Sequence, residues 1–385
     1  MTGNGSLLYF CYDVTGGIAD YARYQIRALA ALGVKVTLLT GKQWRREADE
    51  PYEVLPLLGG APFFAAAHPK LRRLDTALRY WSDFKILEDT IRRGKFNKVL
   101  LGSFIEYLAP LWSWKFARLA KKGVTFAAIA HDPVRDYVIG PRWWHEWSIA
   151  CGYSFLKEVF VHENIQVETY RPMPALRTTV IPFGTYPFAA PSLSRPEARR
   201  KYELPDHARV LLAFGNIRDG KNLDLVLRAM EKFPQVHLVV AGKPQSAAQR
   251  PIQFYQSLAT DLKLADRCRW ICDYIPENEV GNLFEASDLA VLSYSRNFRS
   301  ASSALNVAVH YRKPCLASSG QGNLKSMVSH YQLGVWVEPD SVESLAEGIK
   351  LWLSAQPNPR WADYESENSW RKNAGLVADR MNLLS

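Results

Sequence analysis

Short apolar runs alternate with stretches of helical periodicity along the whole chain. Residues 6–14 form a run typical of a buried strand, and a glycine pair, Gly16 and Gly17, turns the chain after it. Apolar residues then recur at helical spacing as far as Gly33, and residues 34–40 form a second apolar run. This order predicts a strand–helix–strand unit with a right-handed crossover.

The alternation continues to the C-terminus. Further strands are expected at 98–102, 124–130, 158–161, 178–183, 209–215, 236–242, 268–274, 289–294, 314–318 and 334–338. Strands separated by helices predict an α/β protein with doubly wound, Rossmann-like parallel sheets, and 385 residues suit two domains. A linker containing three prolines spans 186–196, and Ser194 with Glu197 forms a capping box for a short helix. We expect domains over 1–186 and 187–360, followed by a helical segment, 361–385, that packs back on the first domain.

The junction between the run 209–214 and the helical pattern after residue 222 is the most informative stretch. Gly215 ends the run, and Arg218 and Lys221 lie between the strand and the helix. Such a turn faces the crevice where parallel α/β sheets bind ligands, and it presents free backbone N–H groups. Two cations at this place could hold a diphosphate; the alternative is a solvated loop that happens to be basic.

Other strand ends carry weaker signals of the same kind. Gly16 and Gly17 allow backbone to approach a ligand, although they form no G-x-G-x-x-G fingerprint and tight turns also need glycine. His131, before Asp132, could hydrogen-bond a sugar or move a proton, or it could simply stabilise a turn. Gly242 ends another strand, and Ser302 or Ser303 could cap a helix whose first N–H groups point at an anion.

Charge is unevenly distributed along the chain. The net charge is +10, and residues 1–190 hold 24 Lys and Arg against 17 Asp and Glu, an excess of 7. Within that half, residues 69–98 and 104–122 interleave cations with aromatic and aliphatic side chains. They could lie on an anionic membrane surface, or they could be amphipathic helices with their aromatics in the core. Nucleic acid is not expected as a partner, because no recognised binding module accompanies the charge.

Compartment and metal signals are sparse. No apolar run reaches the length of a membrane span, and the N-terminus lacks the basic region of a signal peptide. The five cysteines are scattered and read as buried free thiols in a reducing cytoplasm. No Asp-x-Asp motif offers carboxylates for a divalent cation, so no metal or other cofactor is expected.

Taken together, the motifs resemble those of retaining glycosyltransferases of the GT-B fold, in the large family-four-like group that includes bacterial mannosyl- and glucosyltransferases. The resemblance covers nearly the whole chain and rests on six stretches: 15–18, 130–133, 180–184, 214–222, 286–293 and 304–314. It implies transfer of a hexose from a UDP- or GDP-linked sugar to a glycan or lipid-linked oligosaccharide, without a metal. It also implies a role in bacterial polysaccharide or glycolipid synthesis, in the cytoplasm or on the inner face of the cell membrane.

The resemblance also implies roles for individual residues. Arg218 and Lys221 match the basic pair that grips the donor diphosphate, and His131 matches the histidine beside the reacting carbon. Donor contacts are expected from Gly16, Gly17, Gly215, Asn216, Asn222, Gly242, Ser302, Ser303 and Ala304, and base contacts from the backbone at Tyr274 and Ile275. Asp132 and Arg299 are candidates for acceptor or sugar contacts, and Arg296 with Arg299 could pair with an acidic sugar.

One departure from the family pattern is plain. Most relatives carry two glutamates eight positions apart, where this chain has Arg299 and Val307. A subset with a Ser-Gly-Ala-Leu-type helix start also lacks the second glutamate, and Ser302-Ser-Ala-Leu305 is similar to theirs. The rival hypothesis is a non-catalytic nucleotide-sugar-binding protein with the same fold; a GT-B-fold epimerase is a lesser alternative, since the acidic residues it needs are not apparent.

Overall fold

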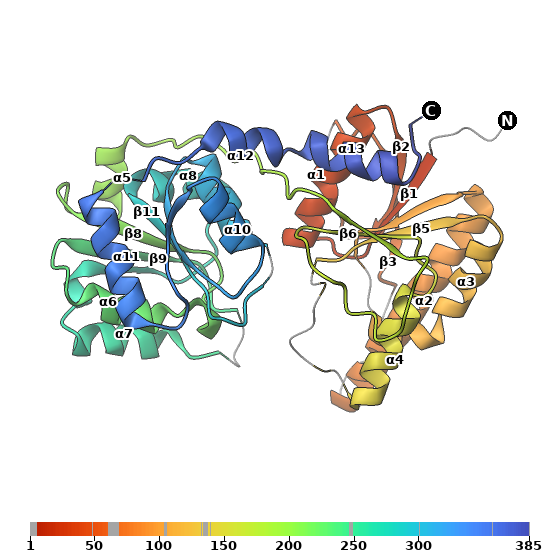
Figure 1. Ribbon diagram of the computed structural model, residues 1–385, viewed down its shortest axis with the longest axis horizontal. Coiled ribbons are helices and arrows are strands. Elements are labelled where there is room, and N and C mark those ends of the chain that lie inside the picture. Colours follow the sequence, from red (N-terminus) through yellow and green to blue (C-terminus); the bar gives the residue numbers. More distant parts are fainter. Residues whose placement is uncertain are drawn as a thin grey trace. The chain divides into compact units, whose positions relative to one another are not determined.

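The computed structural model describes residues 6–384, except 48, 61–68, 104–105, 132, 134–137, 139, 246–248, 300 and 356. The chain forms two compact units (Figure 1): unit 1 is Met1–Phe183 with Ser369–Ser385, and unit 2 is Gly184–Asn368. The first boundary lies three residues before the expected position of 186/187. The C-terminal segment is shared, because its first helix belongs to unit 2 and its second to unit 1.

Unit 1 is built on a parallel sheet with strand order β3-β2-β1-β4-β5-β6-β7. Its strands are β1 (Ser6–Cys11), β2 (Lys35–Gly41), β3 (Glu53–Leu58), β4 (Lys98–Leu101), β5 (Thr125–Ile129), β6 (Glu158–Val161) and β7 (Arg177–Val180). Its helices are α1 (Gly17–Ala31), α2 (Pro69–Gly94), α3 (Ser113–Lys121), α4 (Arg142–Tyr153) and α13 (Trp370–Arg380), with a 3-10 turn, η1 (Glu106–Leu111). Helices α1 and α13 cover one face of the sheet, and α2, α3 and α4 cover the other.

Unit 2 repeats the plan with strand order β10-β9-β8-β11-β12-β13, again parallel. Its strands are β8 (Arg209–Phe214), β9 (Val236–Ala241), β10 (Cys268–Ile271), β11 (Leu289–Ser293), β12 (Cys315–Ser318) and β13 (Gly334–Trp336). Its helices are α5 (Arg195–Lys201), α6 (Leu223–Met230), α7 (Ile252–Asp261), α8 (Glu277–Ala286), α9 (Ser303–His310), α10 (Asn323–His330), α11 (Val342–Ser354) and α12 (Trp361–Glu367), with 3-10 turns η2 (Asp219–Lys221) and η3 (Ala265–Arg267). Apolar clusters on both faces make each sheet a buried middle layer.

Both sheets have a topological switch point, where the strand order reverses. In unit 1 it lies between β1 and β4, and in unit 2 between β8 and β11. Ligands of doubly wound proteins bind beside this point at the carboxyl ends of the strands. The topology therefore fixes, for each unit, the edge at which a site is expected.

The doubly wound α/β architecture and the expected strands are confirmed, with ends that differ by a few residues. Strand β3 was not expected, and the chain from Trp361 onward forms two helices instead of one. The capping box of Ser194 and Glu197 is present. No described helix is long and apolar enough to cross a membrane. All five cysteines are free thiols, but only three are buried as expected, because Cys151 and Cys272 are partly exposed.

Helix α13 is fixed to unit 1 by a buried polar contact. The Asn373 side chain, fully buried, donates to the hydroxyl of Tyr21 at 2.8 Å and to the carbonyl of Pro182 at 2.7 Å. Its carbonyl oxygen accepts from the amide of Gln25 at 2.7 Å. Because the side chains of Asn373, Tyr21 and Gln25 are all buried, the C-terminal helix is an integral part of unit 1.

Candidate functional site

The switch point of unit 2 holds a cavity of about 190 Å³. Its lining comes from the end of β8 and the turn after it, the loop after β9, the residue after β11 and the first turns of α9. It comprises Phe214, Gly215, Asn216, Arg218, Lys221, Gln245, Tyr294, Ser303, Ala304 and Val307. Six of the residues expected to bind the donor or the leaving group therefore line one hollow: Gly215, Asn216, Arg218, Lys221, Ser303 and Ala304. We call it the carboxyl-edge cavity.

Lys221 lies within this cavity. Its ammonium donates a hydrogen bond to the carbonyl of Phe214 at 2.7 Å, which folds the side chain back over the end of β8. Burial lowers the pKa of Lys221 to about 7, and the neighbouring guanidinium of Arg218 acts in the same direction. A bound anion would raise the pKa of Lys221 again, because a nearby negative charge favours the protonated ammonium.

Arg218 is held by aromatic rings. Its guanidinium lies 5.7 Å from the ring centre of Tyr294 and 5.4 Å from that of Phe298, and these two rings stack on one another at 4.1 Å. Such contacts stabilise the cation while leaving its N–H groups free to donate. The pair of cations at the end of β8 is thus directed into a cavity and is not a solvated loop.

The N-terminus of α9 forms another wall. Ser302 caps the helix, since its hydroxyl accepts from the N–H of Leu305 at 3.3 Å and lies 3.0 Å from the hydroxyl of Tyr294. Ser303 and Ala304 follow on the cavity lining, where the first backbone N–H groups add positive potential. Val307 lines the cavity one turn later, at the position where most relatives are expected to carry a glutamate.

The other expected donor residues lie outside the lining. Asn222 is left-handed, with φ of 51°, and donates its side-chain amide to Asp340 at 2.8 Å, so it shapes the turn. Gly242 has no room for a side chain: an added Cβ would lie 2.5 Å from the carbonyl oxygen of Gly215. Tyr274 is 69% exposed, Ile275 packs against the unit 2 core, and Arg299 is exposed.

The expected residues of unit 1 lie at the carboxyl ends of its strands. Gly16, with φ of 84°, precedes the first helical residue, Gly17, so the pair begins α1 as expected. His131 follows β5, and its Nε2 lies 3.1 Å from the carbonyl oxygen of Gly102, which follows β4. The neighbouring candidate Asp132 lies outside the described residues.

His131 belongs to a cluster of rings. Its imidazole meets Tyr21 edge-to-face at 4.9 Å and lies 5.8 Å from His162. Burial, with a further contribution from His131, lowers the pKa of His162 to about 3. His162 is therefore neutral at physiological pH and packs beside the ring of His131. No motif in the sequence singled out His162.

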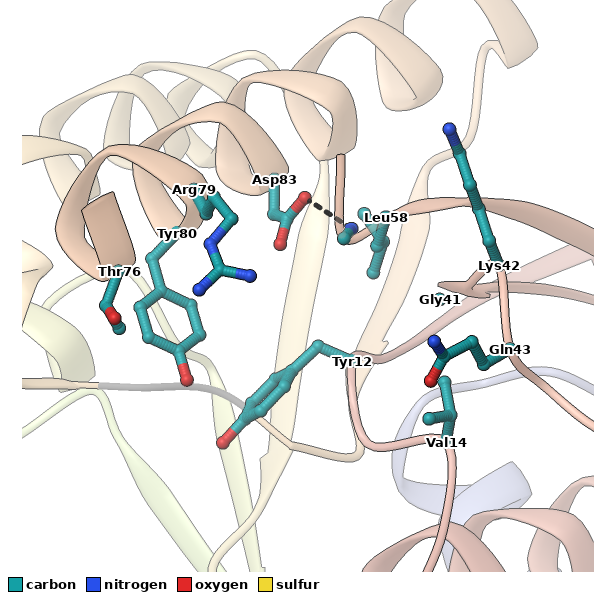
Figure 2. Close-up of a pocket in the computed structure, with 11 residues that line it drawn as sticks. Tyr12, Val14, Gly41, Lys42, Gln43, Leu58, Thr76, Arg79, Tyr80 and Asp83 are labelled. Atoms are coloured by element: carbon teal, nitrogen blue, oxygen red, sulfur yellow. Dashed lines mark hydrogen bonds between the residues drawn. The ribbon is translucent and has the colours of Figure 1, made fainter. Parts of the chain in front are cut away.

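A larger cavity of unit 1, about 410 Å³, was not expected (Figure 2). Its lining comes from the carboxyl ends of β2 and β3, the residues that follow β1, β2 and β3, and α2. It comprises Tyr12, Val14, Gly41, Lys42, Gln43, Leu58, Gly59, Thr76, Arg79, Tyr80 and Asp83. The rings of Tyr12 and Tyr80 meet edge-to-face at 5.6 Å, with Arg79 beside them. Asp83 accepts from the N–H of Gly59 at 3.0 Å, and burial raises the pKa of that carboxyl. We call it the tyrosine cavity.

Among the described residues, no three His, Cys, Asp or Glu side chains gather closely enough to hold a metal ion. The metal-free chemistry expected from the sequence stays a prediction.

The fold and the carboxyl-edge cavity define the class of protein. It has two doubly wound α/β units, and the second has a cavity lined by cationic side chains at its switch point. Residues 194–376, which span most of unit 2, match the family model described as "Glycosyl transferases group 1". Among curated proteins, the D-inositol 3-phosphate glycosyltransferase of Mycolicibacterium smegmatis is 27% identical over 181 residues, which are 46% of this chain and 41% of that protein. The one from Mycobacterium leprae is 36% identical over 105 residues, 27% of this chain and 24% of its own. The chain thus matches less than half the length of these curated relatives.

Solved structures resemble the chain over nearly its full length. Sucrose-phosphate synthase from Thermosynechococcus elongatus has a TM-score of 0.71 at 19% identity, covering 98% of both chains. Anabaena Alr3699/HepE in complex with UDP and glucose has a TM-score of 0.69 at 14% identity, covering 99% of this chain and 100% of its own. WaaG, a glycosyltransferase involved in lipopolysaccharide biosynthesis, has a TM-score of 0.61 at 17% identity, covering 98% and 96%. The fold is therefore the GT-B fold expected from the sequence.

Proposed function

We propose that the protein is a glycosyltransferase that moves a hexose from a nucleotide-diphosphate sugar to a glycan or lipid-linked oligosaccharide. The observation that carries the proposal is the convergence of Arg218, Lys221 and the N-terminus of α9 on one cavity. The family match over residues 194–376 and the UDP that is bound to a protein of the same fold support a nucleotide-linked donor.

The chemistry follows from where charge develops. When the sugar–phosphate bond breaks, negative charge grows on the departing diphosphate while the anomeric carbon becomes cationic. Preorganised cations and backbone N–H groups stabilise such charge in the transition state. Arg218 and Lys221 would supply them in unit 2, so no metal is needed in the proposed reaction. Retention of the anomeric configuration is part of the proposal, as is a contact from His131 to the transferred sugar.

The tyrosine cavity is the proposed acceptor site. It lies at the carboxyl edge of the unit 1 sheet, where doubly wound proteins bind their ligands. Tyr12 and Tyr80 offer hydroxyls and apolar ring faces, while Asp83 and Arg79 offer an acceptor and a donor of hydrogen bonds. This mixture suits a polyol such as a sugar ring better than it suits an apolar ligand.

The experiment separates transfer from binding alone. A panel of UDP- and GDP-linked sugars is first tested by thermal shift, since a ligand of the folded state raises the melting temperature. The stabilising donor is then assayed for hydrolysis without acceptor. Turnover that Arg218→Ala removes, and that the surface variant Lys232→Met leaves intact, supports the proposal. Stabilisation without any hydrolysis or transfer supports the non-catalytic hypothesis instead.

A second proposal concerns the inner membrane surface. One exposed stripe of α2 carries Trp81, Lys85 and Arg92, and one exposed stripe of α3 carries Trp114, Arg118 and Lys121. We call these six residues the basic-aromatic surface. Trp81 and Trp114 are 42% and 48% exposed, and the Lys115 ammonium lies 5.6 Å and 5.7 Å from their ring centres. Other aromatic residues of these segments, Phe84, Trp112 and Phe116, are buried. The two segments are therefore amphipathic helices with some aromatic side chains in the core and others on the surface.

Tryptophan beside lysine and arginine is typical of surfaces that lie at the headgroup level of anionic bilayers. We expect the protein to sediment with phosphatidylglycerol-containing vesicles and not with pure phosphatidylcholine vesicles. Changing Trp114 and Arg118 to Ala should abolish the binding, whereas Lys350→Ala, on α11, should not. Equal sedimentation of the two variants would contradict this assignment without affecting the proposed chemistry.

A further inference from the structure

Unit 2 contains another hollow at the opposite edge of its sheet. It has a volume of about 280 Å³ and lies at the amino ends of β8, β11 and β12. Arg209 is the first residue of β8, and Lys313 and Pro314 directly precede β12. The end of α11 and the start of α12 close it with Trp352 and Trp361. We call it the amino-edge pocket, and β8 separates it from the carboxyl-edge cavity.

The lining is strongly cationic. Four of its side chains are basic (Arg195, Arg209, Arg312 and Lys313), and one, Asp288, is acidic. Asp288 is already saturated: it pairs with Arg195, bonds Arg199 at 3.0 Å, and accepts from the N–H of Val210 at 2.7 Å. Its charge is therefore not available to the other cations of the pocket.

Two cations are left without a hydrogen-bonding partner in the part of the chain that the structure describes. The ammonium of Lys313 is partly buried, and the carboxylates of Glu285 and Asp288 act on it only through space. Burial, reinforced by Arg195 and Arg199, lowers its pKa. The guanidinium of Arg209 lies over the ring of Trp352 at 5.4 Å, a contact that leaves its N–H groups available.

Arg312 differs from these two because its side chain is 64% exposed and lies 3.6 Å from Glu365. It adds positive potential at the rim and is not needed as a ligand. A hollow with surplus positive charge and unfilled donors attracts an anion, and charge-assisted hydrogen bonds to phosphate are among the strongest available to Lys and Arg.

We propose that the amino-edge pocket binds the phosphate group of a small phosphorylated metabolite, with Lys313 and Arg209 as its ligands and Trp361 against the carbon part. The volume lies just below the usual range of small-molecule sites, which fits a ligand of about the size of a phosphorylated monosaccharide. The site is separate from the carboxyl-edge cavity, so this inference does not depend on the proposed transfer reaction.

The test is calorimetric titration of the full-length protein with inorganic phosphate, with glucose 6-phosphate and with UDP. We expect saturable binding of glucose 6-phosphate that Lys313→Met and Arg209→Gln each weaken about tenfold or more, because each removes a charge-assisted hydrogen bond. Lys232→Met, which removes an exposed lysine of the same unit, should have no effect. Binding should also weaken as salt is raised.

Urea unfolding of each variant keeps the result independent of folding, and the titration with UDP reports separately on the proposed function. A Lys313→Met protein that unfolds at the same urea concentration as the wild type is folded, and loss of glucose 6-phosphate binding then supports the proposal. Absence of saturable binding of both phosphates to the wild type overturns it, as does equal binding to wild type and Lys313→Met. Equal affinity for phosphate and glucose 6-phosphate supports the anion ligands and overturns the role of Trp361.

Discussion

The replacement Lys221→Met tests the electrostatics of the carboxyl-edge cavity most directly. It keeps the length of the side chain and removes the ammonium whose pKa burial lowers to about 7 from an ordinary 10.5. At about 1.4 kcal/mol per pKa unit, a shift from 10.5 to about 7 means that holding this charge in the ligand-free protein costs on the order of 5 kcal/mol below pH 7. The lost hydrogen bond to Phe214 offsets part of this by about 1 kcal/mol at every pH.

The pKa of Lys221 also determines how the free energy of unfolding changes with pH. Between pH 7 and 10.5 the unfolded chain binds the proton of Lys221 and the folded protein does not, so wild-type stability rises with pH in this window. The Lys221→Met variant lacks this rise in stability, because methionine does not titrate. We expect its stability advantage over the wild type to be largest at pH 6.5 and to shrink by about 2 kcal/mol at pH 9. Urea unfolding at the two pH values measures this, with Lys232→Met as the matched control.

The same variant should lose ligand affinity. Removing a charge-assisted hydrogen bond to the diphosphate is expected to raise the Kd for UDP by about 10- to 100-fold at pH 6.5. In the wild type, UDP affinity should fall as pH rises above 7, since binding then requires uptake of a proton. A stability difference that is the same at both pH values, together with an unchanged Kd, would refute the reasoning.

Three further predictions concern unit 1 and the reaction. Asn373→Ala leaves buried partners unpaired and should lower the free energy of unfolding by about 3 kcal/mol in urea, while the exposed Lys372→Ala changes it little. The pKa of His162 is about 3 when folded and 6.5 when unfolded, so stability should fall as pH drops through that window; His162→Phe should remove this part of the slope in urea titrations at pH 7 and 5. Turnover of the stabilising donor should be unchanged by EDTA, and its loss on chelation with recovery on adding Mg²⁺ would contradict the metal-free mechanism.

Sequence periodicity predicted the two sheets because buried parallel strands are continuous apolar runs. It missed β3, whose segment contains Pro56 and two exposed positions. A proline argues against a central strand, but β3 is an edge strand, where a missing N–H is tolerated. Composition could not predict that Trp112 is buried while Trp114 is 48% exposed. The two side chains differ because they lie at different angles around the start of α3.

The basic pair at the end of β8 was predictable because Arg218 and Lys221 lie in one short turn with a helix after it. The tyrosine cavity was not, since Tyr12 and Tyr80 are far apart in sequence and meet only when α2 packs beside β1. The amino-edge pocket has the same origin, with Arg209, Lys313 and Trp361 brought together by strand order. Motifs report local turns, whereas cavities assembled from distant segments require the tertiary structure.

The partnership of Asn373 with Gln25 and Tyr21 has a consequence for synthesis on the ribosome. Residues 184–368 are a contiguous stretch, so that unit can fold as soon as it has left the exit tunnel. The unit translated first must instead wait for the 17 residues of 369–385 before α13 can dock on α1. A released chain truncated after residue 368 should therefore hold a mature second half and an unfinished first half, the reverse of the order in which they were made.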